Sequence, residues 1–94
     1  MNKQDFLEAK AHNFVKYISG YKPSEKIENF ISSFSKEEII PTITGKLIPL
    51  VSVGATDTVV ADLLLELEVP PEDKEAVGAK IKAYILMFVE VIKS

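Results

Sequence analysis

The sequence predicts an all-α protein folded as a compact bundle of four to five helices. Hydrophobic residues make up 47% of the 94 residues, which is enough for a globular core. Four long segments repeat their apolar residues at helical spacing, and proline or glycine residues separate them. No repeat or linker divides the chain, so we expect a single helical domain over residues 1–94.

The first helix is expected over about Lys3–Ser19. One of its faces is apolar and the opposite face is charged, as in an amphipathic helix that packs on one core. Gly20 suits the C′ position that ends such a helix. The apolar face consists of Leu7, Ala11, Phe14, Val15 and Ile18, and it is widened on one side by Phe6 and Tyr17.

A second helix is expected to start at Pro23, because proline is favoured in a first turn. Its apolar stripe repeats at i, i+3, i+4 and i+7 and consists of Ile27, Phe30, Ile31 and Phe34. Ser35 and Glu38 follow with the spacing of a capping box, and Ile39 is placed to complete a hydrophobic staple. A new helical turn should therefore start near Lys36.

Residues 41–53 permit two interpretations. Their apolar residues have helical spacing, but the stretch is rich in β-branched residues and also fits a short strand pair around Gly45. We favour a helix, kinked because Pro49 faces the carbonyl of Gly45 four residues back. Pro41 should interrupt the preceding turn and bias Ile40 away from the helical conformation. The segment up to Val53 is thus expected to be Pro-kinked or irregular.

The last two helices are separated by Pro70 and Pro71. Thr56 or Asp57 can cap the first of them. Its buried face consists of Val59, Val60, Leu63, Leu64 and Leu67. The last helix is expected over about residues 72–92. Acidic residues in its first turn complement the positive end of the helix dipole, namely Glu72, Asp73 and Glu75.

The last helix carries more apolar residues than one buried face needs. In projection, Leu86 lies opposite the main apolar face, while Met87 and Val89 lie at its two margins. Leu65 lies off the main face of the preceding helix. Apolar residues ringed by charged ones are typical of an interface centre and its rim. The candidate interface therefore consists of Leu65, Leu86, Met87 and Val89, with Lys82, Glu90 and Lys93 as the rim.

Two other interpretations of these apolar residues remain open. The last helix can be the central helix of the bundle, covered on all sides by its own chain. Its surface can also form a groove for a different protein. Both stand beside the homodimer interface that we assign to the candidate residues.

No residue pattern indicates catalysis, a cofactor or a metal ion. His12 is the single histidine, and it lies on the polar side of the first helix with no nucleophile motif to serve. Acidic residues gather around Pro70, but no calcium-loop pattern accompanies them, so we assign them to solubility and helix-end electrostatics. No glycine motif for phosphate binding occurs. We therefore expect a protein that is not an enzyme.

Nucleic acid is not expected as a partner. The chain has a formal net charge of -3 at pH 7 and contains no arginine, the residue best suited to guanine and phosphate. A helix-turn-helix outline over residues 57–84 leaves a DNA-binding transcriptional regulator as the alternative function. In that outline, Glu72, Asp73 and Glu75 would start the recognition helix and repel phosphates.

The sequence favours a non-enzymatic protein–protein interaction module that acts as an adaptor, inhibitor or assembly component. We expect it to associate as a homodimer through its C-terminal helix, or to bind another protein. No segment has the length of apolar sequence that a membrane span needs. The chain contains no cysteine, and residues 1–5 show no secretory pattern, so we expect a cytoplasmic protein.

Overall fold

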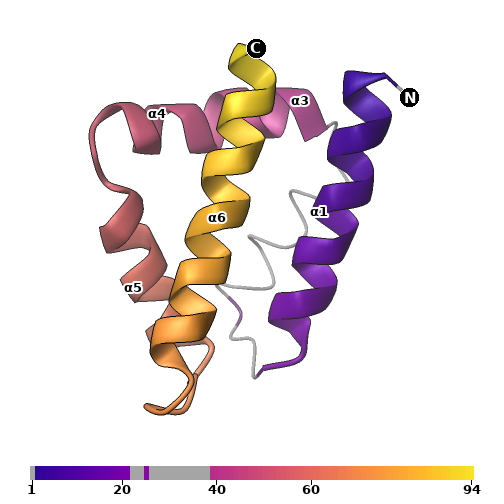
Figure 1. The fold of residues 1–94 in the computed structure, drawn as a ribbon. Helices are drawn as coiled ribbons and strands as arrows, with labels where there is room; N and C mark the ends of the chain where they lie inside the picture. Colours follow the sequence, from indigo (N-terminus) through magenta and orange to yellow (C-terminus); the bar gives the residue numbers. More distant parts are fainter. Residues whose placement is uncertain (1, 22–24, 26–38) are drawn as a thin grey trace.

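The computed structural model describes residues 2–21, 25 and 39–94, and within these residues all regular secondary structure is helical. The predicted all-α fold class is confirmed. In chain order, the elements are α1 (Lys3–Ser19), α3 (Ile39–Thr42), the π-helix η1 (Ile43–Leu47), α4 (Ile48–Ser52), α5 (Thr56–Glu66) and α6 (Lys74–Lys93), as Figure 1 shows. The predicted helix from Pro23 and the capping box of Ser35 and Glu38 lie outside the described residues.

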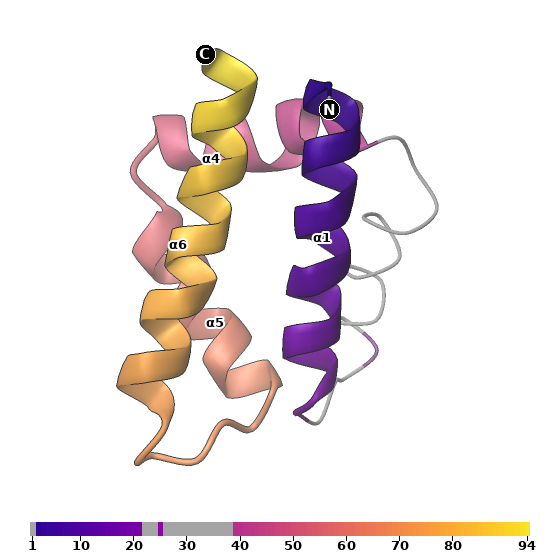
Figure 2. The same cartoon turned by 45° about the vertical axis from the view of Figure 1, so that its right-hand side comes forward.

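Helix α6 is the central helix of the described structure and contacts α1, η1, α4 and α5 (Figures 1 and 2). Helices α1 and α6 run side by side in opposite directions, so the two termini lie at the same end of the molecule. There Lys3 Nζ donates a hydrogen bond to the carbonyl oxygen of Ser94 at 3.1 Å. Helix α5 lies on the other side of α6, and the α3–η1–α4 segment crosses the end that carries the termini.

The hydrophobic core runs along α6, where it meets α1, the α3–η1–α4 segment and α5. Phe14 of α1 is fully buried, and its ring centroid lies 5.1 Å from that of Tyr84 and 5.9 Å from that of Phe88. Both predicted apolar faces, of the first and the last helix, therefore supply the core. Among the described residues, the other large ones that are fully buried are Leu7, Ile18, Ile39, Ile43, Leu47, Leu67, Ile81 and Ile85.

Helix α1 has the predicted bounds, and its two ends are capped in different ways. Asn2 caps the start, because its Oδ1 accepts a hydrogen bond from the backbone N–H of Asp5 at 2.8 Å. Gly20 is the C-cap residue and not the C′ residue that the sequence suggested. Its φ of -69° is right-handed, and its N–H donates to the carbonyl oxygen of Tyr17, which tightens the last turn.

Within the segment over residues 41–53, the chain is helical up to Ser52, so the favoured interpretation is confirmed and the strand pair is wrong. The expected distortion before Pro49 takes the form of η1, in which the N–H of Ile48 donates to the carbonyl oxygen of Ile43, five residues back. Pro49 has no N–H to donate to the carbonyl of Gly45, and in a regular α-helix its ring would clash with that carbonyl. The π turn relieves both problems. The expectation for Ile40 was wrong, because Ile40 and Pro41 are both helical within α3. The preference against helix before a proline is a steric bias that packing overrides.

Two turns of the same geometry end α4 and α5. After α4, the N–H groups of Gly54 and Ala55 donate to the carbonyls of Val51 and Leu50, and Gly54 has a φ of 74°. This pattern is a Schellman motif, which needs a left-handed residue at C′. Ala55 then becomes the N-cap of α5, so the predicted cap at Thr56 or Asp57 was wrong by one or two residues. The compact turn leaves the chain no extended residue whose side chain can cap the helix.

The Schellman motif after α5 places a charged residue in the left-handed position. The N–H groups of Glu68 and Val69 donate to the carbonyls of Leu65 and Leu64, and Glu68 has a φ of 52°. Val69 is buried in the core cluster, which is the hydrophobic contact that accompanies this motif. Burial of Val69 therefore compensates for the unfavourable backbone conformation of Glu68.

Within the described residues, no single helix has the length and apolar composition of a membrane span. The α3–η1–α4 segment and α5 together reach that composition, but the chain bends by 114° between them.

Candidate interaction surface on the C-terminal helix

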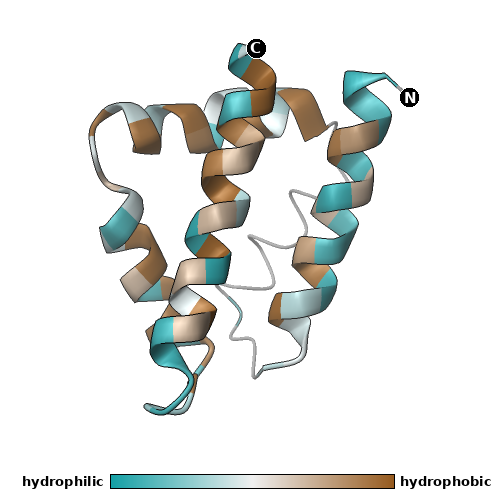
Figure 3. Cartoon of the chain, in the orientation of Figure 1, coloured by the Kyte–Doolittle hydropathy of each residue, from teal (hydrophilic) through white to brown (hydrophobic). Residues whose placement is uncertain are grey.

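The predicted interface residues are distributed over three different parts of the structure. Leu65 and Leu86 are exposed, with 66% and 38% of their surface accessible to solvent. Glu90 and Lys93 are also exposed, near the C-terminal end of α6. Figure 3 shows that the surface of α6 turned to the viewer alternates hydrophobic and hydrophilic residues.

Val89 does not belong to this surface. It is 4% exposed and lies in the hydrophobic core, so its assignment to the interface was wrong. The projection of one helix locates Val89 at the margin of the apolar face, but it cannot include the neighbouring elements. In the structure η1 and α4 also pack against α6 and widen the buried sector.

Leu65 and Leu86 are too far apart to form one patch. Lys82 of α6 forms an ion pair with Asp57 of α5, with 2.8 Å between Nζ and Oδ1, so these two residues lie at the same height. Helices α5 and α6 run in opposite directions (Figure 1). With a rise of about 1.5 Å per residue, Leu65 and Leu86 are roughly 18 Å apart along the helix axes. The structure therefore separates them into two surfaces.

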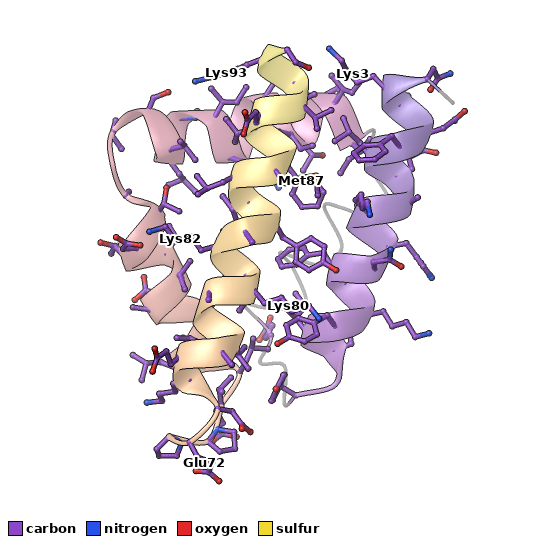
Figure 4. The ribbon with its side chains drawn as sticks, in the orientation of Figure 1. Lys3, Glu72, Lys80, Lys82, Met87 and Lys93 are labelled. Carbon is purple, nitrogen blue, oxygen red and sulfur yellow. The ribbon has the colours of Figure 1, made fainter. Side chains whose placement is uncertain are left out.

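Met87 lies on a third surface, a groove between α1 and α6. The groove has a volume of about 440 Å³. We name it the α1/α6 groove. Its lining residues are Phe6 and Lys10 of α1 and Lys80, Ala83, Tyr84 and Met87 of α6. Figure 4 shows Lys80 and Met87 on the side of α6 that faces α1. Four of the six lining residues are apolar or aromatic, and the other two are lysines.

The groove has a positive rim in an acidic protein. Lys10 Nζ lies 5.5 Å from the centroid of the Phe6 ring, and Lys80 Nζ lies 4.3 Å from that of Tyr17. Such cation–π contacts hold the ammonium groups beside the groove while leaving them hydrated. The lining residues include two lysines and no acid, although the whole chain has a net charge of -3. The groove thus favours a partner that is apolar and negatively charged.

Tyr17 supports this arrangement as a neutral ring. Burial is the main cause that raises its pKa above the ordinary value of 10.0. The charge of Tyr21 and a hydrogen bond with that side chain add to the shift, followed by smaller effects of Asp73 and Tyr84. Tyr17 therefore stays protonated at neutral pH, and its uncharged face remains available to the Lys80 ammonium group.

Sequence reasoning missed most of the groove and found only Met87. The available signal was Phe6 and Tyr17, which widen the apolar face of α1 on one side. Two helices form the groove together, so neither helix reveals it when it is projected alone.

The described residues contain no candidate metal site, because no group of three or more His, Cys, Asp or Glu side chains is placed to hold an ion. His12 is exposed on α1. No protein-family model, no curated protein and no solved structure matches this chain.

Proposed function

We propose that this chain is a non-enzymatic protein–protein interaction module that associates with a second copy through α6. The observation that carries the proposal is the α1/α6 groove, which is an open apolar surface on the central helix of the bundle. A central helix normally has its apolar residues covered by its own chain. Here Tyr84 and Met87 are only partly covered, and Leu86 is exposed on the adjacent outer side.

Protein association is the use that fits such a surface best. Interfaces combine apolar and aromatic centres with a charged rim, and methionine adapts to partners of varied shape. Met87, Tyr84 and Phe6 supply the apolar centre, while Lys10 and Lys80 supply the rim. The burial of apolar side chains contributes about 25 cal/mol per Å², which here favours a weak, concentration-dependent contact.

DNA binding remains the alternative, and the structure offers it little support. The first turn of α6, which would meet the DNA, carries Glu75 and follows Glu72 and Asp73, all of them exposed. Negative charges at this position repel phosphates. A salt titration distinguishes the two functions, because phosphate binding collapses as salt rises and apolar association does not.

The experiment measures the solution mass of the chain by sedimentation equilibrium from micromolar to millimolar concentration. We expect the mass to rise with concentration and to fall again in Leu86→Lys or in Met87→Lys, with helix content unchanged. Val53→Lys is the matched control, because Val53 is 78% exposed in the α4–α5 turn, away from α6. A parent that stays monomeric at all concentrations, or two α6 variants that associate like the parent, would refute the proposal.

A further inference from the structure

A second exposed surface has a protruding apolar side chain and a negative charge, both of which the α1/α6 groove lacks. On the outer side of α5, Leu65 is 66% exposed and is the most prominent apolar side chain of that helix. Asp62, one turn earlier, is exposed beside it, and so is Ala61. We name Ala61, Asp62 and Leu65 the α5 face. It presents one apolar side chain next to a negative charge.

The α5 face and the α1/α6 groove complement each other in two respects. Leu65 is a protruding apolar side chain, and the groove is an apolar recess lined by Phe6, Tyr84 and Met87. Asp62 is negative, and the lysines of the groove are positive. Complementary charge at the rim directs association and disfavours incorrect partners.

The two surfaces do not meet within one chain. Leu65 is 66% exposed and is not among the residues that line the groove, and in the view of Figure 1 α1 and α5 lie on opposite sides of α6. Direct contact between the α5 face and the groove therefore requires two copies. A contact between two different surfaces is heterologous, so a pair of copies retains one free α5 face and one free α1/α6 groove.

We propose that the chain associates head to tail: the α5 face of one copy docks into the α1/α6 groove of the next. This inference rests on the proposed function and specifies its geometry. Leu65 enters the groove beside Met87 and Tyr84, and Asp62 lies near Lys10 or Lys80. Assembly extends beyond a dimer as concentration rises, and it produces a ring or an open filament according to the rotation between copies.

The test uses two variants of the full chain, each blocked on one surface. Leu65→Lys removes the protruding side chain and leaves the groove intact, whereas Met87→Glu places a repelling charge in the groove and leaves the α5 face intact. Each variant alone is expected to associate about tenfold or more weakly than the parent. Mixed in equal amounts, the two variants should form a heterodimer and nothing larger, because one intact contact remains and both ends are blocked.

Additional variants keep this test decisive. Lys80→Glu replaces Met87→Glu if the latter loses helix content, since Lys80 is exposed. Asp62→Lys combined with Lys80→Glu in a second chain should restore association by exchanging the charges. Val53→Lys should associate like the parent.

Each other outcome rejects the inference in an identifiable way. If Leu65→Lys associates like the parent, the head-to-tail contact is wrong while self-association through α6 stands. If the mixed variants remain monomeric while the parent associates, the contact is isologous or uses other residues. A parent that is monomeric at every concentration rejects both this inference and the proposed function, and it leaves the groove to an acidic partner of a different sequence.

Discussion

The two sides of α6 are packed in different ways. Toward α5 the helices are close, because Gly78 has no side chain: a Cβ at this position would lie 3.2 Å from Leu64 Cδ1 and 3.6 Å from Val60 Cγ1. Toward α1 the contact is made by large rings, because the Phe14 ring packs against those of Tyr84 and Phe88. The first contact is named here the α5/α6 seam and the second the α1/α6 seam. The α1/α6 groove runs along the second.

This difference shows how residue size decides where a small bundle remains open. A glycine lets a neighbouring helix approach until ordinary side chains fill the space between them. Aromatic rings fill the interior of the α1/α6 seam, and Tyr84 both contacts Phe14 and lines the groove. The core and the groove at this seam therefore share a side chain.

The largest expected effect is at the α1/α6 seam. Phe14→Ala should lower the free energy of unfolding by about 3–5 kcal/mol, as for other fully buried phenylalanines. Denaturant titration followed by circular dichroism measures it, and Tyr84→Phe is the control because it keeps the ring. A loss below about 1 kcal/mol would mean that the ring cluster does not hold this seam.

A smaller loss is expected at the α5/α6 seam. Gly78→Val should lower the free energy of unfolding by about 1–3 kcal/mol, because its branched side chain enters the space of Leu64. Gly45→Ala is the matched control: Gly45 is exposed in η1 with open space around it, so alanine should stabilise by about 0.5–1 kcal/mol. Equal stabilisation by both substitutions would show that α5 is not closely packed on α6.

The turn that closes the α5/α6 seam gives a prediction of opposite sign. Glu68→Gly should stabilise the fold by about 1 kcal/mol, because glycine adopts the left-handed conformation without steric cost. Gly54→Ala, in the equivalent turn after α4, should destabilise by about the same amount. Thermal unfolding of both variants beside the parent is sufficient, and shifts in the same direction would contradict the shared geometry.

The smallest effect is expected at the outer edge of the α5/α6 seam. Lys82 and Asp57 form an ion pair that is largely exposed, so Lys82→Ala should change the free energy of unfolding by less than about 1 kcal/mol. A double-mutant cycle with Asp57→Ala isolates the pair. A coupling energy above about 1 kcal/mol would show that the ion pair, and not the missing side chain of Gly78, determines how closely α5 packs on α6.

Local patterns in the sequence predicted the helical elements well. Lys3–Ser19 has its predicted bounds, and residues 41–52 are helical with a distortion at the expected place. The errors concern features that depend on neighbouring segments. Because of the turn geometry at Gly54, the N-cap of α5 is Ala55 and not the predicted Thr56 or Asp57. Ile40 is helical in spite of the proline that follows it, because packing overrides the local preference.

The candidate surface was less predictable, because a surface is defined by more than one helix. Leu86 was correctly placed outside the core, whereas Val89 was not, because η1 and α4 cover part of α6 that the projection left open. The groove combines α1 with α6, two segments separated by more than half of the chain. No local pattern relates Phe6 to Met87, so their juxtaposition required the fold.

The most direct test of association at the α1/α6 groove is the methyl resonance of Met87 in a dilution series. The chain has two methionines, Met1 and Met87, so a sample with labelled methionine methyl groups gives two signals, which Met87→Leu assigns. If copies associate through the groove, the Met87 signal shifts as concentration rises from micromolar to millimolar, in step with the measured mass. A mass that rises while the Met87 signal stays fixed would place the interface elsewhere and contradict the account.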